Sequence, residues 1–492
     1  MRAVLYFRPT RADMTVILPP PLVFQEQLWS TGALTGMAVG LRHALGRERG
    51  RSTGRLAMVM ANRPQSIALF FALSSFSVPL VLLPPDMKPW RSDPPLPRDT
   101  LLVLLESERD LEAGARSLDV PVAIIAEPEP RGGSPDAPAF MTMPGVVLFT
   151  SGSTGRPRPV YRSTRALLDV SRALLHAFGL RPGDGVITTL PLARAFGLNH
   201  GLMAAAALGS PLALFDHFEH NGLLRSFGSG AYQYWAGTPM MADVLGRTRL
   251  SGRHPAPPVC VVGGRVSSEI ARRFLERFGV PLRQCYGTTE TGSIAVDGGP
   301  SERVRSDTAG RALAGVDVRI GDDPRVPLQA GQAGRIWLST PAYMMDGYGF
   351  PPDLDLPETV DGWWGTPDVG VLDDRGALVV SGRLDDCFRT NAGHLVDPAS
   401  VAAALDGYPS VIDTAVVPLA TPTGPTLGVL IESAAPLRMT DLRGHLARSL
   451  PVWSRPRVIE TISALPRLSN GRIDRRACIA LLEKALSSDG SA

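Results

Sequence analysis

The chain's most informative stretch reads Val146-Val147-Leu148-Phe149-Thr150-Ser151-Gly152-Ser153-Thr154-Gly155-Arg156-Pro157-Arg158. Its first four residues are apolar and predict a buried strand. The hydroxyls and glycines that follow predict a turn in which backbone N–H groups and hydroxyls converge on an anion, because glycine allows close approach of the backbone. The Walker A pattern GxxxxGK[ST] does not fit this turn. The stretch therefore predicts a strand that leads into an anion-binding loop of another kind, with an ordinary Ser/Gly surface loop as the alternative.

Length and composition describe a globular protein with more than one domain. The chain has 492 residues, of which 44% are hydrophobic and 20% are charged, and chains of this length usually split into domains. The formal net charge of +3, from 50 basic and 47 acidic residues, gives no reason to expect a nucleic acid or an anionic membrane surface as a partner. Lys88 and Lys484 are the only lysines, so the other basic residues are arginines.

Cysteine spacing and hydropathy indicate the cellular compartment in which the protein is expected. The four cysteines lie far apart without a CxxC pattern, which indicates neither a disulfide framework nor a zinc site. Residues 1–15 lack the apolar core of a signal peptide. The apolar segment 67–83 is interrupted by Pro79, so it predicts a buried helix and a buried strand rather than one membrane span. We therefore expect a cytoplasmic protein with no membrane span.

Helix and strand signals alternate along most of the chain, which predicts a mainly parallel sheet flanked by helices. The first such segments are residues 31–45, 56–60, 65–73 and 80–83. From about residue 307 to residue 380, short strands separated by Gly, Pro and Asp turns predict a small β region. After Gly382, a tail of about 110 residues has the size of a domain. In this tail we expect helices at 398–405 and 440–449 and strands at 414–418 and 427–431.

These patterns together predict an α/β fold class. A large N-terminal domain with parallel-rich sheets flanked by helices is expected to include the small β region. A small α+β domain is expected to follow it at the C-terminus.

Four further motifs follow the loop in chain order. They are Tyr286-Gly287-Thr288-Thr289-Glu290, Thr366-Pro367-Asp368, Gly382-Arg383-Leu384-Asp385 and Ser469-Asn470-Gly471-Arg472. In the first motif the aromatic ring suits stacking on a base, threonine suits a phosphate and Glu290 suits Mg²⁺. Asp368 suits both hydroxyls of a ribose, and Arg383 suits ribose or phosphate. Taken singly, the motifs are also typical of a strand–turn, a surface turn or a hairpin.

In this order and spacing, the motifs resemble those of the adenylate-forming superfamily of acyl-CoA and aryl-CoA synthetases, adenylation domains and luciferases. The resemblance covers nearly the whole chain, most firmly residues 146–475. It implies a large N-terminal AMP-binding domain at residues 1–382, a hinge at Asp385 and a small mobile C-terminal domain at residues 383–492. It also implies a reaction in which a carboxylate attacks the α-phosphorus of ATP, releasing pyrophosphate and forming an acyl-AMP that is then transferred to a thiol.

The resemblance further implies a role for each matching residue. The β- and γ-phosphates would be held by Thr150, Ser151, Gly152, Ser153, Thr154 and Gly155. The rest of the nucleotide would be contacted by Tyr286 at the adenine site, Thr289 at the α-phosphate, Glu290 as the Mg²⁺ ligand, and Asp368 with Arg383 at the ribose. Gly287 and Thr288 would also belong to the nucleotide-binding residues. Gly263 and Gly264 would lie beside the acyl pocket. Such chemistry requires orientation and charge stabilisation at phosphorus rather than covalent help.

The most consequential departure from the family pattern is Arg472, which stands where the family has a lysine that reaches the carboxylate and the α-phosphate. Arginine keeps the charge but is bulkier, planar and forked, so the exchange is not conservative at a tight site. Drift towards arginine in a lysine-poor protein is the alternative explanation. Adequate catalysis by Arg472 and slow or lost adenylation therefore both remain open.

Other departures concern the acyl side and the thiol side. Arg194, two residues before Phe196, stands where the family has a histidine that gates the acyl pocket. Pro367 replaces a glycine before Asp368, which stiffens that turn. The segment after Arg383 is one residue longer than usual before its glycine, which makes the use of CoA less secure than adenylation.

The acid itself is only broadly indicated. Residues 193–199 contain no acidic side chain that would bind an α-ammonium group, so an α-amino acid is disfavoured. The surrounding residues are apolar and suit an aryl or aliphatic acid, although they are equally typical of an ordinary core. They include Phe196, Leu198, Met203, Trp235, Met240 and Met241.

Three hypotheses follow for the function. The first is an ATP- and Mg²⁺-dependent ligase that forms an acyl-AMP from a small carboxylic acid and then an acyl-CoA. In the second, the adenylate is transferred to the phosphopantetheine of an acyl carrier protein or is captured intramolecularly. The third is a degenerate homologue that binds a nucleotide or an acyl ligand and catalyses weakly.

Overall fold

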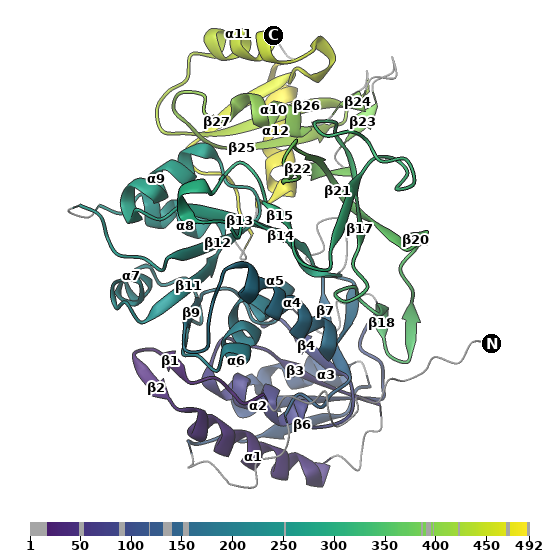
Figure 1. Cartoon of the computed structure of the whole chain (residues 1–492). Helices are drawn as coiled ribbons and strands as arrows, with labels where there is room; N and C mark the ends of the chain where they lie inside the picture. Colours follow the sequence, from purple (N-terminus) through teal and green to yellow (C-terminus); the bar gives the residue numbers. More distant parts are fainter. Residues whose placement is uncertain are drawn as a thin grey trace. The chain divides into compact units, whose positions relative to one another are not determined.

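The computed structural model describes most of the chain (Figure 1). The described residues are 17–48, 54–87, 94–117, 119–130, 140–150, 157–249, 252–384, 387–389, 395–396, 398–421, 424–468 and 473–489. The chain divides into two compact units. Unit 1 comprises Met1–Arg172, Arg181–His217 and Tyr343–Leu356, and unit 2 comprises Ala173–Leu180, Phe218–Ala342 and Pro357–Ala492.

Unit 1 contains an eight-stranded sheet with the order β19-β18-β8-β7-β4-β3-β5-β6. Its strands are β3 (Arg55–Val59), β4 (Leu80–Leu83), β5 (Thr100–Leu105), β6 (Val122–Ile125), β7 (Gly145–Phe149), β8 (Pro159–Ser163), β18 (Gly347–Phe350) and β19 (Asp353–Asp355). The strands from β7 to β6 pair in parallel, and β8, β18 and β19 extend the sheet antiparallel. The unit also contains the neighbouring strands β9 (Gly185–Thr188), β10 (Leu212–Leu214), β1 (Leu22–Phe24) and β2 (Gln27–Trp29).

Helices join these strands. They are α1 (Thr31–Glu48), α2 (Pro64–Ser74), η4 (Glu106–Leu111), α3 (Glu112–Arg116), α4 (Thr164–Ala177), α5 (Ala195–Gly197), the π-helix η5 (Leu198–Met203) and α6 (Ala204–Leu208). Helix α2 is apolar on every side and is fully buried from Ile67 to Leu73, as expected for a helix inside a core. Strand β4 follows it, so the apolar segment 67–83 is a helix and a strand, as predicted. Within the described ranges, no helix is both long and apolar enough to cross a bilayer.

The first part of unit 2 contains the parallel strands β11 (Tyr232–Gly237), β12 (Val259–Gly263) and β13 (Leu282–Thr288), followed antiparallel by β14 (Gly292–Val296) and β15 (Arg311–Ala312). Three helices accompany them, namely α7 (His220–Gly228), α8 (Pro239–Gly246) and α9 (Ser268–Phe278). A 3₁₀ turn, η6 (Ser301–Arg303), lies between β14 and β15. The predicted small β region is an antiparallel sheet of β16 (Asp317–Ile320), β17 (Gly334–Ser339), β20 (Thr359–Val360), β21 (Trp363–Leu372) and β22 (Leu378–Arg383).

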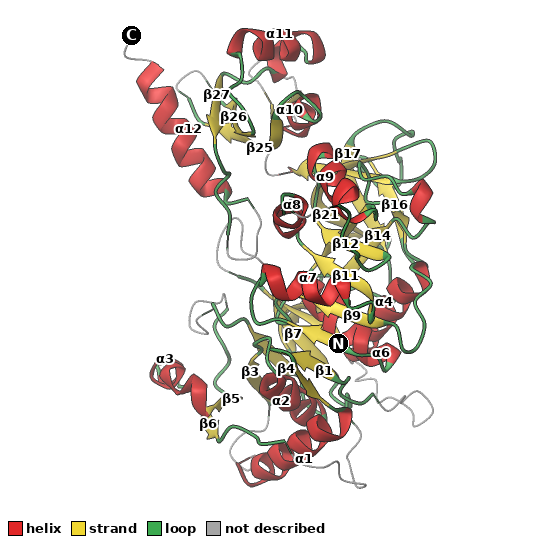
Figure 2. Ribbon diagram, turned by 90° about the vertical axis from the view of Figure 1, so that its left-hand side faces the viewer, coloured by secondary structure: helices red, strands yellow, loops and turns green. Residues whose placement is uncertain are grey.

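The C-terminal part of unit 2 is built on the strands β25 (Val411–Leu419), β26 (Thr426–Ser433) and β27 (Val458–Ile462). Because side chains alternate along a strand, Val429 and Ile431 pack with α10 (Pro398–Leu405) and α11 (Met439–Ser449). Leu430 points to the other face and packs with α12 (Arg475–Asp489). Figure 2 shows α10 and α12 on opposite sides of this sheet. The remaining elements are β23 (Phe388–Arg389), β24 (Leu395–Val396) and η8 (Val452–Ser454).

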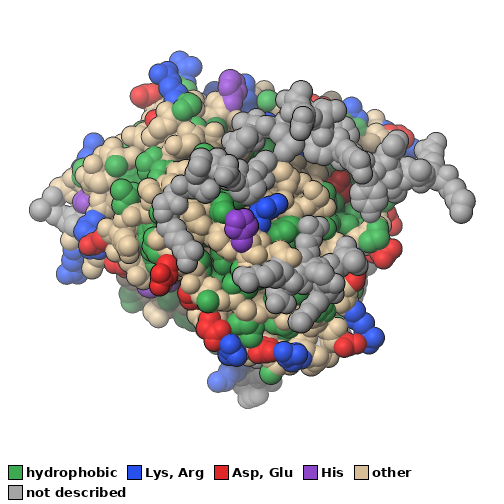
Figure 3. Space-filling view, turned by 90° about the horizontal axis from the view of Figure 1, so that it is seen from below, with side chains coloured by type: hydrophobic (Ala, Val, Ile, Leu, Met, Phe, Trp, Pro, Cys, Tyr) green, Lys and Arg blue, Asp and Glu red, His purple; other side chains and the backbone are tan. Residues whose placement is uncertain are grey.

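These elements confirm the predicted α/β class, with its small β region and its C-terminal α+β part. The domain boundary at residue 382 remains a prediction. On the face drawn in Figure 3, acidic and basic side chains are interspersed among hydrophobic ones.

Candidate active site

Two of the sequence motifs in unit 2 meet at one hydrogen bond. Tyr286 lies on β13 and Asp368 lies on β21, and the Tyr286 hydroxyl donates to Asp368 Oδ2 at 2.8 Å, although 82 positions separate the two residues in the sequence. Arg383 on β22 is the register partner of Asp368. The structure therefore brings together the three residues expected at the base and the ribose.

Further hydrogen bonds hold Asp368, and burial surrounds Tyr286. The Asp368 N–H donates to Thr366 Oγ1 at 3.1 Å, and the fully buried Thr366 hydroxyl donates to the carbonyl of Ile336 at 3.0 Å. Tyr286 is 8% exposed, and its burial, followed by the negative charge of Asp368, raises its pKa well above the ordinary value. Tyr286 is therefore a neutral hydrogen-bond donor at physiological pH.

Thr289 and Glu290 form the turn between β13 and β14, directly after Thr288, and both are half-buried. A bulge between Tyr286 and Gly287 precedes this turn. A Cβ at Gly287 would lie 2.5 Å from a backbone oxygen of β14, so this close approach requires glycine. The charge of Glu290 contributes to the raised pKa of Tyr286.

The chemistry of these side chains fits a magnesium nucleotide. A carboxylate offers about four acceptor positions, so Asp368 can accept from Tyr286 and still accept from ribose hydroxyls. Mg²⁺ is commonly bound by one or two carboxylates together with phosphate oxygens, and Glu290 supplies one such carboxylate. In the part of the chain that the structure describes, no group of three or more His, Cys, Asp or Glu side chains is placed to bind a metal without a ligand's help.

The two glycines expected beside the acyl pocket lie where β12 ends. Gly264 has a φ of +113°, a conformation that other residues rarely adopt. Gly263 and Gly264 line a cavity of about 340 Å³ together with Arg383 of the expected ribose site and Arg467 of the C-terminal part. The structure thus places the two glycines expected beside the acyl pocket and one residue expected at the ribose around the same cavity.

The predicted phosphate loop lies in unit 1. Thr150 directly follows β7, and its N–H donates to the Arg158 carbonyl at 3.0 Å while the Arg158 N–H donates to Thr150 Oγ1 at 3.1 Å. The Arg158 guanidinium stacks over the Tyr348 ring at 3.9 Å, a cation–π contact. These bonds join Thr150 and Arg158, the two residues that flank the predicted phosphate loop in the sequence.

Arg194 also belongs to unit 1 and precedes α5. Its Nη1 donates to the carbonyl of Phe149, the last residue of β7, at 3.4 Å, and its Nη2 lies 3.7 Å from Asp86. Burial lowers the pKa of Arg194, and the charge of Asp86 opposes this shift. Arg194, which stands where the family pattern has a histidine, therefore contacts the end of β7, directly before the predicted phosphate loop.

Phe196, the other residue expected at the acyl pocket, is half-buried. Its ring packs on that of His200 with 4.1 Å between the centroids. His200 is fully buried, which lowers its pKa to about 3. It is therefore a neutral side chain at physiological pH.

Some expected site residues lie outside the described residues. They are Ser151, Gly152, Ser153, Thr154 and Gly155 of the phosphate loop, Asp385 at the expected hinge, and Arg472. Their roles remain predictions.

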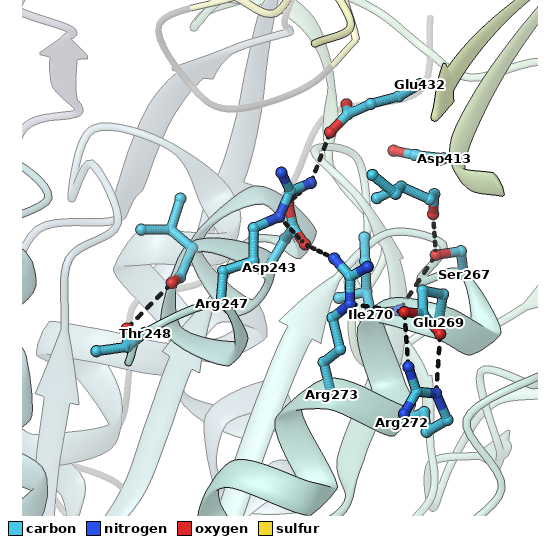
Figure 4. A network of polar contacts seen from close by, with 12 residues as sticks. Asp243, Arg247, Thr248, Ser267, Glu269, Ile270, Arg272, Arg273, Asp413 and Glu432 are labelled. Carbon is cyan, nitrogen blue, oxygen red and sulfur yellow. Dashed lines mark hydrogen bonds and ion pairs between the residues drawn. The ribbon is translucent and has the colours of Figure 1, made fainter. Parts of the chain in front are cut away.

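A cluster of charged residues near the C-terminal part of unit 2 was not predicted from the sequence; it is formed by Arg247, Asp413 and Glu432 (Figure 4) and by Arg467. These residues are far apart in the chain and belong to no motif. No local signal could have identified them.

Comparison with known families identifies the class. Residues 33–349 match the model of the AMP-binding enzyme family. Because this match covers more than half of the chain, the chain belongs to this family. It is thus a member of the adenylate-forming superfamily.

Curated relatives are similar at moderate identity. The chain is 27% identical over 354 residues to 4-coumarate–CoA ligase-like 2 of Arabidopsis thaliana, covering 69% of this chain but only 62% of that protein. It is 26% identical over 331 residues to the 2-succinylbenzoate–CoA ligase of Listeria monocytogenes, covering 67% of this chain and 68% of that enzyme. The chain therefore spans less than two thirds of the Arabidopsis relative.

Solved structures share the fold. The amide bond synthetase McbA from Marinactinospora thermotolerans has a TM-score of 0.79 at 25% identity, covering 96% of this chain and 98% of that chain. ATP-bound MatB from Rhodopseudomonas palustris has the same TM-score at 20% identity, covering 96% and 97% of the two chains.

Proposed function

We propose that this protein is an AMP-forming acid–thiol ligase that activates an aryl or aliphatic carboxylic acid with ATP and Mg²⁺ and transfers the acyl group to CoA. The observation that carries the proposal is the hydrogen bond between Tyr286 and Asp368. It unites two motifs that lie far apart in the sequence, and both have a place at the nucleotide in this family. The names of the CoA ligases among the relatives support the choice of acceptor.

In the first half-reaction, a carboxylate oxygen of the acid attacks the α-phosphorus of ATP. The bond from this phosphorus to the bridging oxygen breaks, so that pyrophosphate leaves and the acyl-AMP forms. Glu290 would hold Mg²⁺, which when bound would neutralise phosphate charge. Asp368 orients the ribose, Thr289 contacts the α-phosphate and Arg472 supplies a cation where negative charge develops.

In the second half-reaction, the sulfur of the thiol attacks the acyl carbonyl carbon and AMP leaves as the carbon–oxygen bond breaks. CoA is the proposed thiol. A carrier-protein phosphopantetheine has the same reacting group, so acceptor assays must compare the two.

A pyrophosphate-release assay across a panel of aryl, aliphatic and α-amino acids tests the proposal. We expect release that depends on an aryl or aliphatic acid and on Mg²⁺, with little response to the amino acids. Arg472→Ala should lower kcat by about 10²–10³-fold, the usual cost of losing one charge-stabilising donor. Arg472→Lys should retain a measurable rate because it keeps the charge.

Two results would contradict the proposal. The degenerate homologue would be favoured if the native chain bound ATP without an acid but released no pyrophosphate, and if Arg472→Lys restored pyrophosphate release. A rate for Arg472→Ala equal to that of the native chain would remove the cationic role of Arg472. For the acceptor, thioester formation with CoA but not with a phosphopantetheinylated carrier protein is the expected outcome.

A further inference from the structure

Strand β21 leaves its ladder with β17 at the point where it carries Asp368. The register of the two strands shifts between Arg335 and Trp337 of β17. One residue separates these two on β17, whereas residues 366–368 separate their partners on β21. Pro367 within this stretch has no N–H to donate to a ladder. Asp368 therefore lies in a bulge of β21 on the side that faces β17.

The side chain of Arg335 spans this bulge. Its Nε donates to the Thr366 carbonyl at 2.8 Å, and its Nη2 donates to the Gly365 carbonyl at 2.7 Å. One edge of the planar guanidinium thus binds two consecutive carbonyls of β21, a two-point contact that the point charge of a lysine does not reproduce. The guanidinium also lies over the Trp337 ring, with 4.8 Å between Cζ and the ring centroid. It is therefore held by a ring of its own strand as well as by the backbone of β21.

Gly365 leaves the space that this guanidinium occupies. A Cβ at position 365 would lie 2.5 Å from Arg335 Cζ, and its three nearest atoms would all belong to the guanidinium. The φ of Gly365 is in the range that other residues adopt. An alanine there would therefore conflict with the Arg335 side chain rather than with the backbone.

The backbone that Arg335 binds leads directly to Asp368. The Thr366 hydroxyl accepts the Asp368 N–H at 3.1 Å and donates to the Ile336 carbonyl at 3.0 Å. The Asp368 carboxylate in turn accepts from the Tyr286 hydroxyl at 2.8 Å. Arg335 thus binds the carbonyl of the same residue whose hydroxyl holds Asp368.

We propose that Arg335 is a positioning residue for Asp368: its guanidinium holds the bulge of β21 so that the carboxylate faces the ribose of a bound nucleotide. The inference rests on the proposed function, in which Asp368 binds the ribose. Gly365 and Thr366 are buried, and a buried carbonyl that loses its donor is costly. Loss of Arg335 should therefore let the bulge rearrange and move Asp368 away from the ribose.

Arg335→Met tests this role, because it removes the guanidinium and keeps an apolar stem. Isothermal titration compares ATP with 2′,3′-dideoxy-ATP, which lacks the two hydroxyls that would donate to Asp368. We expect the Kd for ATP to rise about tenfold, and the Kd for the dideoxy nucleotide to change by less than about twofold. A general loss of structure would weaken the binding of both nucleotides by the same factor. Equal losses for the two nucleotides, or a native Kd for ATP, would overturn the proposal.

Gly365→Ala displaces the guanidinium while Arg335 itself is kept. It should raise the Kd for ATP by about the same factor as Arg335→Met. In the Arg335→Met background it should add little, because residues that act through one contact are not additive. Arg335→Lys should recover part of the affinity, since it keeps the charge and one donor group. Additive losses in the double variant would contradict the contact between Arg335 and the bulge as their common cause.

Arg319 on β16 offers the matched control. Its guanidinium lies over the Trp363 ring at 4.1 Å, and its Nη1 donates to the Pro324 carbonyl at 2.7 Å. It therefore makes the same kinds of contact as Arg335, but its hydrogen bond goes to the connection between β16 and β17 instead of to the bulge. Arg319→Met should leave the Kd of both nucleotides within about twofold of the native value. If it weakened ATP binding as much as Arg335→Met does, the effect would belong to the whole sheet and the proposal would fail.

A measurement without nucleotide keeps this inference separate from the proposed function. Hydrogen–deuterium exchange in peptides that cover β21 should be about tenfold faster at the bulge in Arg335→Met than in the native chain, because exchange reports local opening. Native exchange in this variant would overturn the role of Arg335 in holding the bulge. Absent ATP binding by the native chain, together with faster exchange in Arg335→Met, would overturn only the proposed function.

Discussion

Two parts of unit 2, the strands that carry Tyr286 and Asp368 and the charged cluster around Arg467, are held by different kinds of interaction. Tyr286, Asp368 and Arg383 lie on strands whose backbone register sets their positions. The segment with Arg472 is flanked instead by Arg467, whose position depends on ion pairs with buried carboxylates.

This difference predicts different consequences of substitution. Strand pairing distributes its stability over many backbone hydrogen bonds, so a side-chain change on the nucleotide side should alter contacts with the ligand and little else. An ion-pair cluster depends on each member, because removing one partner leaves a buried charge uncompensated. Changes there should alter geometry, and therefore the rate rather than nucleotide affinity.

The largest effect is expected for Asp368→Ala. This change removes the acceptor for the ribose hydroxyls, and two hydrogen bonds to a charged group are together worth about 10²–10⁴-fold in kcat/KM for ATP. Isothermal titration with ATP and steady-state kinetics measure it. Asp374→Asn is the matched control, because Asp374 is an exposed carboxylate in the neighbouring β21–β22 turn. An Asp368→Ala enzyme with native ATP affinity would contradict the assignment of the ribose site.

Gly287→Ala should have the next largest effect and tests the backbone side of the comparison directly. A Cβ there would lie 2.5 Å from the Gly292 carbonyl oxygen, and overpacking against backbone costs roughly 1–3 kcal/mol. The strained turn carries Thr289 and Glu290, so both the melting temperature and kcat should fall. Gly40→Ala is the control, since a Cβ at Gly40 meets nothing within 4 Å. Equal melting temperatures for the two variants would contradict the close-approach argument.

Much of the fold could be predicted because its strands are short apolar runs between turn residues. The predicted helix at 31–45 lies within α1, and the predicted strands at 414–418 and 427–431 lie within β25 and β26. Strands β8 and β18 were missed. The sequence Pro159-Val-Tyr-Arg-Ser163 contains proline and buries a charged side chain, and Gly347-Tyr-Gly-Phe350 is half glycine, so neither carries the usual strand pattern.

The site could be predicted only as far as its motifs extend. Tyr286, Asp368 and Gly264 each belong to a local pattern, which is why the sequence could single them out, and their roles remain predictions. The pairing of Arg247 with Glu432 joins residues 185 positions apart, and neither residue has an unusual neighbourhood in the sequence. Such pairs depend on how helices and strands pack, which no local pattern contains.

Tyr286→Phe should have a smaller effect than either change above. It keeps the ring that lines the adenine site and removes only the hydroxyl that donates to Asp368. A net loss of about 1 kcal/mol corresponds to roughly a fivefold rise in KM for ATP with little change in kcat. Steady-state kinetics with varied ATP measure this split. A fall in kcat without a change in KM would mean that the hydroxyl acts in the chemical step. It would contradict the expectation that changes at this side of the site alter nucleotide affinity rather than rate.

The smallest expected effect is a dependence on pH, and it tests the ion-pair cluster around Arg467. Burial raises the pKa of Asp413 above its ordinary value of 3.8, while the charge of Arg467 lowers it and the charge of Glu432 raises it. Because the pKa is higher in the folded state, protonation of Asp413 favours the folded state, and this contribution to stability is lost as pH rises through the folded pKa. Lowering the pH should therefore weaken the ion pair between Asp413 and Arg467, whereas protonation of Asp413 should not lower the stability of the fold.

We expect kcat of the native chain to fall by about twofold more than that of Asp413→Asn as pH is lowered towards the folded pKa of Asp413, since roughly 0.4 kcal/mol separates such rates. Parallel pH profiles of kcat and of melting temperature measure the two quantities. Asp441→Asn, at an exposed position in the first turn of α11, should keep the native profile. If kcat fell at low pH by the same factor in Asp413→Asn and in the native chain, the Asp413 carboxylate would not control the position of Arg467. The two sides of the site would then not differ in the way that their contacts indicate.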